Sequence, residues 1–159
     1  MKNFKHILLF ILLTISLSVS GQGILHQNMS GYTALKNQLL SIVGEEGLSE
    51  WNMLILAICG VESTYKKPTN DNFHGFMQLS RTYVKEVNRI FGTKYTYDDA
   101  HSFEKSVNMH NLMNKAKNKE KHIHKAIKIH NSREEYKKKV LKELGHIKSH
   151  EKNLKNGNN

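Results

Sequence analysis

Residues 54–79, LILAICGVESTYKKPTNDNFHGFMQL, contain the pattern that decides the fold. Leu54, Ile58 and Glu62 are spaced four residues apart, so they lie along one stripe of a helix. A polar segment rich in Asn, Thr and Asp follows, and such a composition is typical of a turn-rich loop. The stretch therefore predicts a buried helix that carries a carboxylate at the end of its apolar face.

Helical spacing of apolar residues continues on both sides of this stretch and predicts five or six helices. They are expected over residues 32–43, 49–63, 80–91, 102–113, 123–130 and 132–147. Serines at the start of several of these segments are suited to cap a helix. A short strand or hairpin is expected around residues 73–77, and an irregular lead-in over 22–30. The fold class is accordingly all-α or α-dominated, with at most a short β hairpin.

The first 21 of the 159 residues have the pattern of a secretory signal peptide. Lys2 and Lys5 precede an apolar run over residues 7–17, and small residues follow it. The run is shorter than the ~20 residues that a membrane span needs, and an uncleaved anchor is the alternative. We expect export to the periplasm or the outside, with cleavage near Ser20 or Gly21. One domain over residues 22–147 and a disordered basic tail over 148–159 would follow.

Positive charge is concentrated in the last third of the chain. Residues 115–159 hold fourteen Lys and Arg against five Asp and Glu, whereas residues 22–114 hold eight against nine. This distribution predicts attraction to an anionic cell-wall or membrane surface, and a solvated face of lysine-rich helices explains it equally well. The basic segment has no pattern of aromatic residues alternating with its lysines, and the sequence has no phosphate-binding glycine loop. Nucleic acid is therefore not an expected partner.

Glu62 is the residue most suited to catalysis. Burial beside apolar residues makes ionisation of a carboxylate costly, and a general acid must hold its proton. An ordinary paired or solvated glutamate at a helix end is the alternative. The single cysteine, Cys59, is expected to be a buried hydrophobe. His122 and His124 are alternate residues on a helix and point in different directions, so neither a metal nor a cofactor is expected.

Glu62-Ser63 after an apolar helix, a polar loop and then Gly75-Phe76-Met77-Gln78-Leu79 resemble the lytic transglycosylase (SLT-type) branch of the lysozyme-like superfamily. Two further segments agree with that family: TYDDAHSFEKSVNMHNLMN, which leads into a helix, and AIKIHN at residues 126–131. The resemblance covers residues 48–140. His130 stands where the family has Tyr, Ser132-Arg133 stands where a Gly should follow, and Phe76 replaces the common Leu.

The resemblance implies an exported enzyme that cleaves the MurNAc–GlcNAc bond of peptidoglycan, with Glu62 as its single acid and base. It implies substrate contacts or positioning roles for several other residues, namely Ser63, Gly75, Met77, Gln78, His130 and Asn131. A monomer acting on glycan strands is expected. If the enzyme instead uses water, as a muramidase does, the second acid would be one of three loop aspartates: Asp71, Asp98 or Asp99.

Two other classes of function remain open from the sequence. A noncatalytic wall-binding or secretion-apparatus accessory would keep the lysozyme-like fold without turnover. A cationic protein that acts on membranes or polyanions would depend on residues 115–159, and its activity would fall steeply with salt.

Overall fold

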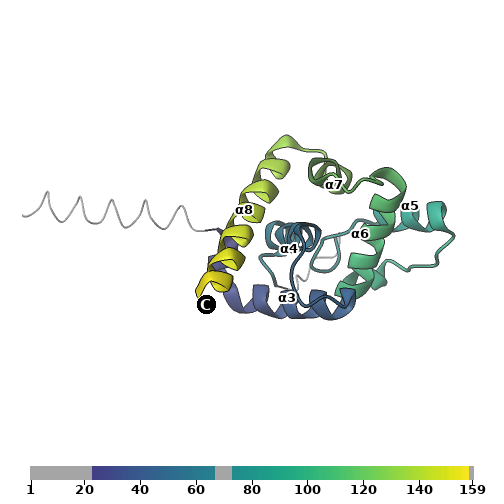
Figure 1. The fold of residues 1–159 in the computed structure, drawn as a ribbon. Coiled ribbons are helices and arrows are strands. Elements are labelled where there is room, and N and C mark those ends of the chain that lie inside the picture. Colours follow the sequence, from purple (N-terminus) through teal and green to yellow (C-terminus); the bar gives the residue numbers. More distant parts are fainter. Residues whose placement is uncertain (1–22, 67–72, 158–159) are drawn as a thin grey trace, which may run out of the picture.

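The computed structural model describes residues 23–66 and 73–157, which form helices arranged around one central helix (Figure 1). That helix is α4 (Glu50–Ser63). It begins where the Ser49 hydroxyl accepts a hydrogen bond from the Asn52 backbone N–H at 3.2 Å, an N-cap interaction. Residues 54–60 of α4 are buried on every face, which explains why their sequence is continuously apolar. The predicted all-α fold is confirmed.

The remaining helices surround α4. In chain order they are α2 (Ile24–Gln27), α3 (Met29–Val43), α5 (Arg81–Phe91), the 3-10 turn η1 (Asp98–His101), α6 (Phe103–Lys117), α7 (Ile123–His130) and α8 (Glu134–Gly157). In Figure 1, α4 is seen nearly end-on, with α3, α6, α7 and α8 on four sides of it. The most extensive helix–helix contact is that between α4 and α8.

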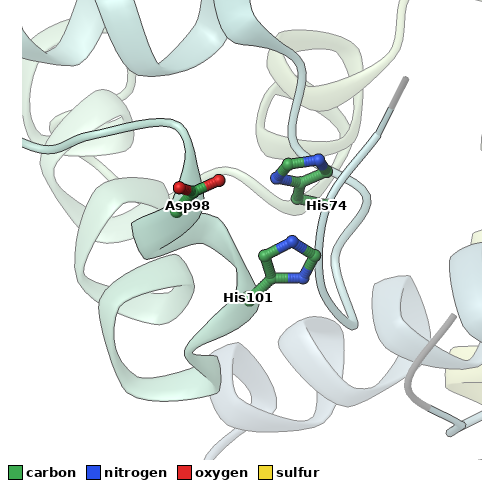
Figure 2. Close-up of side chains that lie close together, drawn as sticks. All are labelled: His74, Asp98 and His101. Carbon is green, nitrogen blue, oxygen red and sulfur yellow. The ribbon is translucent and has the colours of Figure 1, made fainter. Parts of the chain in front are cut away.

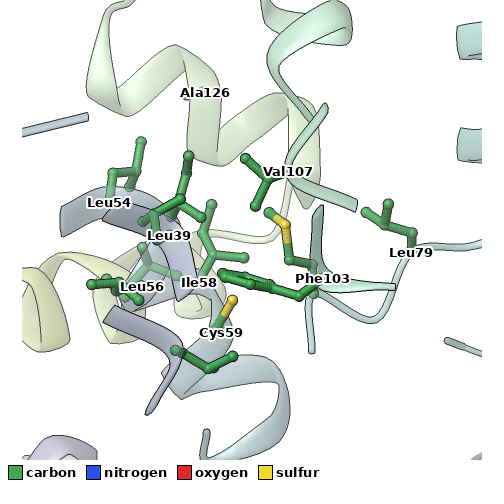
Figure 3. Packing of buried hydrophobic residues seen from close by; sticks show 14 of the residues in the cluster. Leu39, Leu54, Leu56, Ile58, Cys59, Leu79, Phe103, Val107 and Ala126 are labelled. Atoms are coloured by element: carbon green, nitrogen blue, oxygen red, sulfur yellow. The ribbon is translucent and has the colours of Figure 1, made fainter. Parts of the chain in front are cut away.

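The core lies between α4 and its neighbours (Figure 3). Leu39 from α3, Val107 from α6 and Ala126 from α7 are fully buried in the cluster that contains Ile58. Cys59 is also fully buried, as expected for a small hydrophobe. Burial raises the pKa of its thiol, so the sulfur stays protonated and unreactive at neutral pH.

Residues 73–79, just before α5, form a tight reversal of the chain. His74 and Leu79 pair as an isolated antiparallel bridge, through backbone hydrogen bonds of 3.3 and 3.1 Å. This is the short hairpin-like feature expected near residues 73–77. Gly75 adopts a φ of 74°, and a Cβ there would lie 1.9 Å from the Ala100 carbonyl oxygen. The reversal therefore presses against η1, at a distance that only glycine permits.

Both ends of the described chain are more ordered than the sequence predicts. Residues 24–27 form α2 instead of an irregular lead-in. The disordered tail expected from residue 148 is wrong as far as Gly157, because α8 continues to that residue. Polar contacts explain the extension: the Glu151 carboxylate accepts hydrogen bonds from the Tyr32 hydroxyl at 2.7 Å and from the Lys36 ammonium at 2.7 and 2.8 Å.

No helix within residues 23–66 and 73–157 has the length and apolarity needed to cross a lipid bilayer. The predicted signal peptide, residues 1–21, lies outside the described residues and stays a prediction.

Candidate active site

Glu62 stands on the last turn of α4, where it borders a cavity of about 270 Å³. Its side chain is 19% exposed, so the carboxylate is mostly shielded and yet open to the cavity. Residues from the reversal, α5 and the end of α7 complete the wall: Phe73, Gln78, Leu79, Ser80, Tyr83, His130 and Asn131. Within the described residues, Glu62 is the only carboxylate that lines this cavity.

His130, the last residue of α7, contacts Glu62 directly. Its Nε2 lies 3.2 Å from the Glu62 Oε1, and its side chain is only 4% exposed. Either the imidazole N–H donates to a carboxylate, or a protonated Glu62 donates its O–H to a neutral imidazole. The same contact therefore accommodates the carboxyl both before and after it gives up a proton.

Aromatic side chains pack around this pair. The Tyr136 ring stacks on His130, with centroids 5.8 Å apart and an interplanar angle of 19°. Burial raises the pKa of the Tyr136 hydroxyl, and the charge of Glu62 raises it further. Burial also raises the pKa of Tyr83, so both phenols remain donors at neutral pH. The Tyr83 hydroxyl has no hydrogen-bond partner among the described residues.

The structure brings four of the seven predicted site residues together. Glu62, Gln78, His130 and Asn131 share the cavity wall. The Gln78 side-chain N–H donates to the Gly75 carbonyl at 2.8 Å, which orients the amide. The Asn131 side-chain oxygen accepts the Arg133 backbone N–H at 3.1 Å, which leaves its amide donors for another group.

The other three predicted site residues do not line the cavity. The Ser63 hydroxyl donates to the Cys59 carbonyl at 2.7 Å, an ordinary bond at a helix end. Met77 is fully buried in the core below the reversal. Gly75 permits a close approach to the backbone of Ala100, and its contact with a sugar stays a prediction.

The aspartates considered as second acids do not join Glu62 in the described chain. Asp99 accepts the Thr96 backbone N–H at 2.7 Å and pairs with Lys105, and these contacts hold the pKa of its carboxyl below the ordinary value. Asp98 is exposed on η1 and does not line the cavity. Asp71 lies outside the described residues.

Sequence reasoning missed the tyrosines around Glu62. Tyr83 and Tyr136 occupy apolar positions of helical stripes, a pattern that predicts core packing. Only the fold reveals that the stripes of α5 and α8 converge on the end of α4. No signal in the sequence distinguishes these two rings from other buried aromatic residues.

A larger cavity, about 590 Å³, lies at the opposite end of α4. Trp51, Asn111 and three lysines contribute to its wall, and the Trp51 indole N–H donates to the Asn111 side-chain oxygen at 2.9 Å. Its one carboxylate, Glu45, accepts a hydrogen bond from Asn52 at 2.8 Å and is exposed. Because this cavity holds no shielded acid, we place the candidate active site at Glu62.

The buried His110, which lies next to His130, should make the folded protein less stable at acid pH. Burial, with a smaller contribution from His130, lowers the pKa of His110 from 6.5 to about 3. Below pH 6.5 this histidine takes up a proton in the unfolded chain but not in the folded chain. Its contribution to the free energy of unfolding is therefore complete above pH 6.5 and is lost as the pH falls toward 3. Urea unfolding should show roughly 2 kcal/mol lost at about pH 5 for this residue alone.

The variant His110→Gln should remove that part of the pH dependence, and His124→Gln, at an exposed position, should keep it. Equal slopes of unfolding free energy against pH in the wild type and His110→Gln would contradict the assignment.

This chain has no match among family models, curated proteins or solved structures.

Proposed function

We propose that this protein is an exported lytic transglycosylase that cleaves the MurNAc–GlcNAc bonds of peptidoglycan, with Glu62 as its single acid and base. One observation carries the proposal: a shielded carboxylate faces a cavity between two side-chain amides, 3.2 Å from a buried imidazole. The residues that meet there come from three separate segments of the motif resemblance. A structural glutamate would have no need of a cavity or of amides around it.

The residues support a two-step use of one proton. Protonated Glu62 gives its proton to the glycosidic oxygen as the bond from that oxygen to the sugar C1 breaks. The leaving sugar departs with a hydroxyl, and the substrate's own N-acetyl group supports the positive charge at C1. The Glu62 carboxylate then removes the proton from the C6 hydroxyl, and the C6 oxygen forms a bond to C1 of the same sugar. Anhydro ends form without water, and Glu62 is protonated again.

The surrounding groups would orient the substrate and the acid. The His130 contact fixes the rotamer of Glu62 in both protonation states. The amides of Gln78 and Asn131 suit the N-acetyl groups of the glycan, because they offer both donors and acceptors. A cavity of about 270 Å³ is slightly smaller than the ~300 Å³ at which the range for small-molecule sites begins, so it would admit one sugar unit and leave the rest of the strand outside.

The basic helices would hold the enzyme near its substrate. Lysines on α8 such as Lys139 and Lys142 are exposed, and anionic wall polymers or lipid headgroups would attract them. Binding through this surface should weaken as salt rises, because exposed charges are screened. The chemistry at Glu62 does not depend on it.

Digestion of purified sacculi tests the proposal. The mature chain, from residue 22 onward, should release soluble muropeptides, and mass spectrometry should find anhydro ends on them. Reducing ends would instead indicate a muramidase that uses water. Sedimentation of the protein with sacculi without any release would contradict an enzyme and indicate the noncatalytic accessory.

A further inference from the structure

Asp98 and His101 lie on the same side of η1. The turn is a 3-10 helix, which has three residues per turn, so side chains three positions apart are aligned. Asp98 is exposed, so its side chain keeps freedom to move, whereas His101 is half-buried. The turn therefore presents one carboxylate and one imidazole in the same direction.

His74 is brought to that side of η1 by the reversal after residue 73. Its neighbour Gly75 packs against the Ala100 carbonyl, which fixes the reversal on the turn. The His74 ring is stacked between two others: the Tyr97 ring at 3.8 Å and the His101 ring at 4.0 Å, measured between centroids. His74 is buried, and its Nδ1 lies 3.3 Å from the Tyr97 carbonyl oxygen.

The three donor groups converge. One ligand atom from each of His74, Asp98 and His101 lies within 4.8 Å of the other two. Figure 2 shows the Asp98 carboxylate directed toward the His74 ring, with the His101 ring beneath it. Within residues 23–66 and 73–157, this is the one group of three His, Cys, Asp or Glu side chains with such spacing.

Asp98 differs from the adjacent Asp99 in its ion pairing. Asp99 is paired with Lys105, whereas Asp98 forms no ion pair within the described chain. The Arg81 guanidinium lies 4.6 Å from the centroid of the Tyr97 ring. Because His74 stacks on that ring too, the two occupy opposite faces of it, and the arginine does not enter the space between the three donors.

We propose that His74, Asp98 and His101 bind a divalent transition-metal ion, with Zn²⁺ as the best match. Two imidazoles and one carboxylate are a ligand set that zinc accepts, with water in the fourth position. Ligand atoms around tetrahedral zinc lie about 3.4 Å apart, given bonds of about 2.0–2.1 Å. The donors must therefore close by up to ~1.4 Å from a spacing within 4.8 Å, and the exposed Asp98 can make much of that movement by rotation.

No metal was expected from the sequence, because the histidine spacing within helices does not converge ligands. His74 and Asp98 are far apart along the chain, and no local motif joins them. The convergence depends on Gly75, which lets the reversal lie against η1.

The metal would have a structural effect on the Glu62 cavity. The reversal that carries His74 also carries Phe73 and Gln78, which line that cavity. A bound ion would tie this wall to η1 and α6, so it would restrict the movement of Gln78. Metal binding itself does not require the proposed glycan chemistry, and the two can fail separately.

Titration with Zn²⁺ tests the site, with the chain from residue 22 onward carrying no added histidines. Calorimetry near pH 7.5 should find one ion per chain with a Kd below about 10 μM. Cobalt(II) should give the intense visible absorption of a four-coordinate ion. The melting temperature should rise with added zinc, because only the folded chain assembles the three donors.

Asp98→Asn and His101→Ala should each weaken zinc binding by at least about tenfold. His124→Ala, which removes an exposed histidine elsewhere, should bind as the wild type does. Circular dichroism should show the same helical content in all the variants, since neither Asp98 nor His101 is a core residue. The proposal is overturned if no saturable binding occurs up to about 1 mM zinc, or if both site variants bind as tightly as the wild type.

Discussion

Glu62→Gln should give a folded protein that releases muropeptides from sacculi only at a greatly reduced rate. General acid–base catalysis by a positioned side chain contributes about 10²–10⁴-fold, and a glutamine can neither donate a proton to the glycosidic oxygen nor accept one afterwards. The side-chain shape is kept, and the amide can still meet the His130 ring. The rate of soluble muropeptide release should therefore fall by about that factor while the melting temperature stays close to that of the wild type.

Glu46→Gln is the matched control, because Glu46 is exposed and lines neither of the two cavities around α4. It should digest sacculi at the wild-type rate. Retention of full activity by Glu62→Gln would exclude Glu62 as the acid, whatever the products are.

Glu143→Ala should be the most destabilising substitution proposed for this chain. Glu143, on α8, is 2% exposed, and its carboxylate accepts the backbone N–H groups of Ile24 and Leu25 at 2.9 and 2.7 Å. It also accepts the Tyr65 hydroxyl at 2.6 Å. Alanine would leave two buried donors and one partly buried donor without an acceptor, at about 1–3 kcal/mol for each buried donor. The free energy of unfolding in urea should fall by about 3–5 kcal/mol.

Glu135→Ala, on the same helix but with an exposed carboxylate, should change the unfolding free energy by less than about 0.5 kcal/mol. A loss below about 1 kcal/mol for Glu143→Ala would mean that the three donors find other partners or water.

The helices could be predicted because their signals are local. Ser49, Ser80 and Ser102 each accept a backbone N–H three residues later, as the sequence indicates. Gly44 and Gly92 end their helices in the left-handed conformation, with φ of 67° and 65°. Such caps depend on residues within one turn, so they need no knowledge of the fold.

The extension of α8 could not be predicted, because charged and polar contacts stabilise it. Beyond Ile147 the sequence shows no apolar stripe, and its composition is typical of a disordered tail. The helix continues because Glu151 binds two side chains of α3, more than a hundred residues earlier in the chain. Hydrophobic periodicity carries no information about such a contact.

Only part of the candidate site could be predicted, because sequence motifs do not report contacts between distant segments. Glu62, Gln78, His130 and Asn131 belong to motif segments, and the structure brings them together. Gly75 and Ser63 have the right residue types, but local backbone packing uses them. The two tyrosines and the His74 cluster depend on which helix faces which, and a single sequence does not state that.

The contacts of Glu143 and Glu151 join the beginning of the domain to its last helix, across 115 to 119 residues of chain. A chain that emerges with its N-terminus first cannot make them until α8 is free. Until then α4 lacks the helix that covers it most, and its apolar surface stays open to chaperones or to other chains. The domain can therefore complete its fold only after its final thirty residues or so have been synthesised. Truncated products should be recognised by chaperones as unfolded.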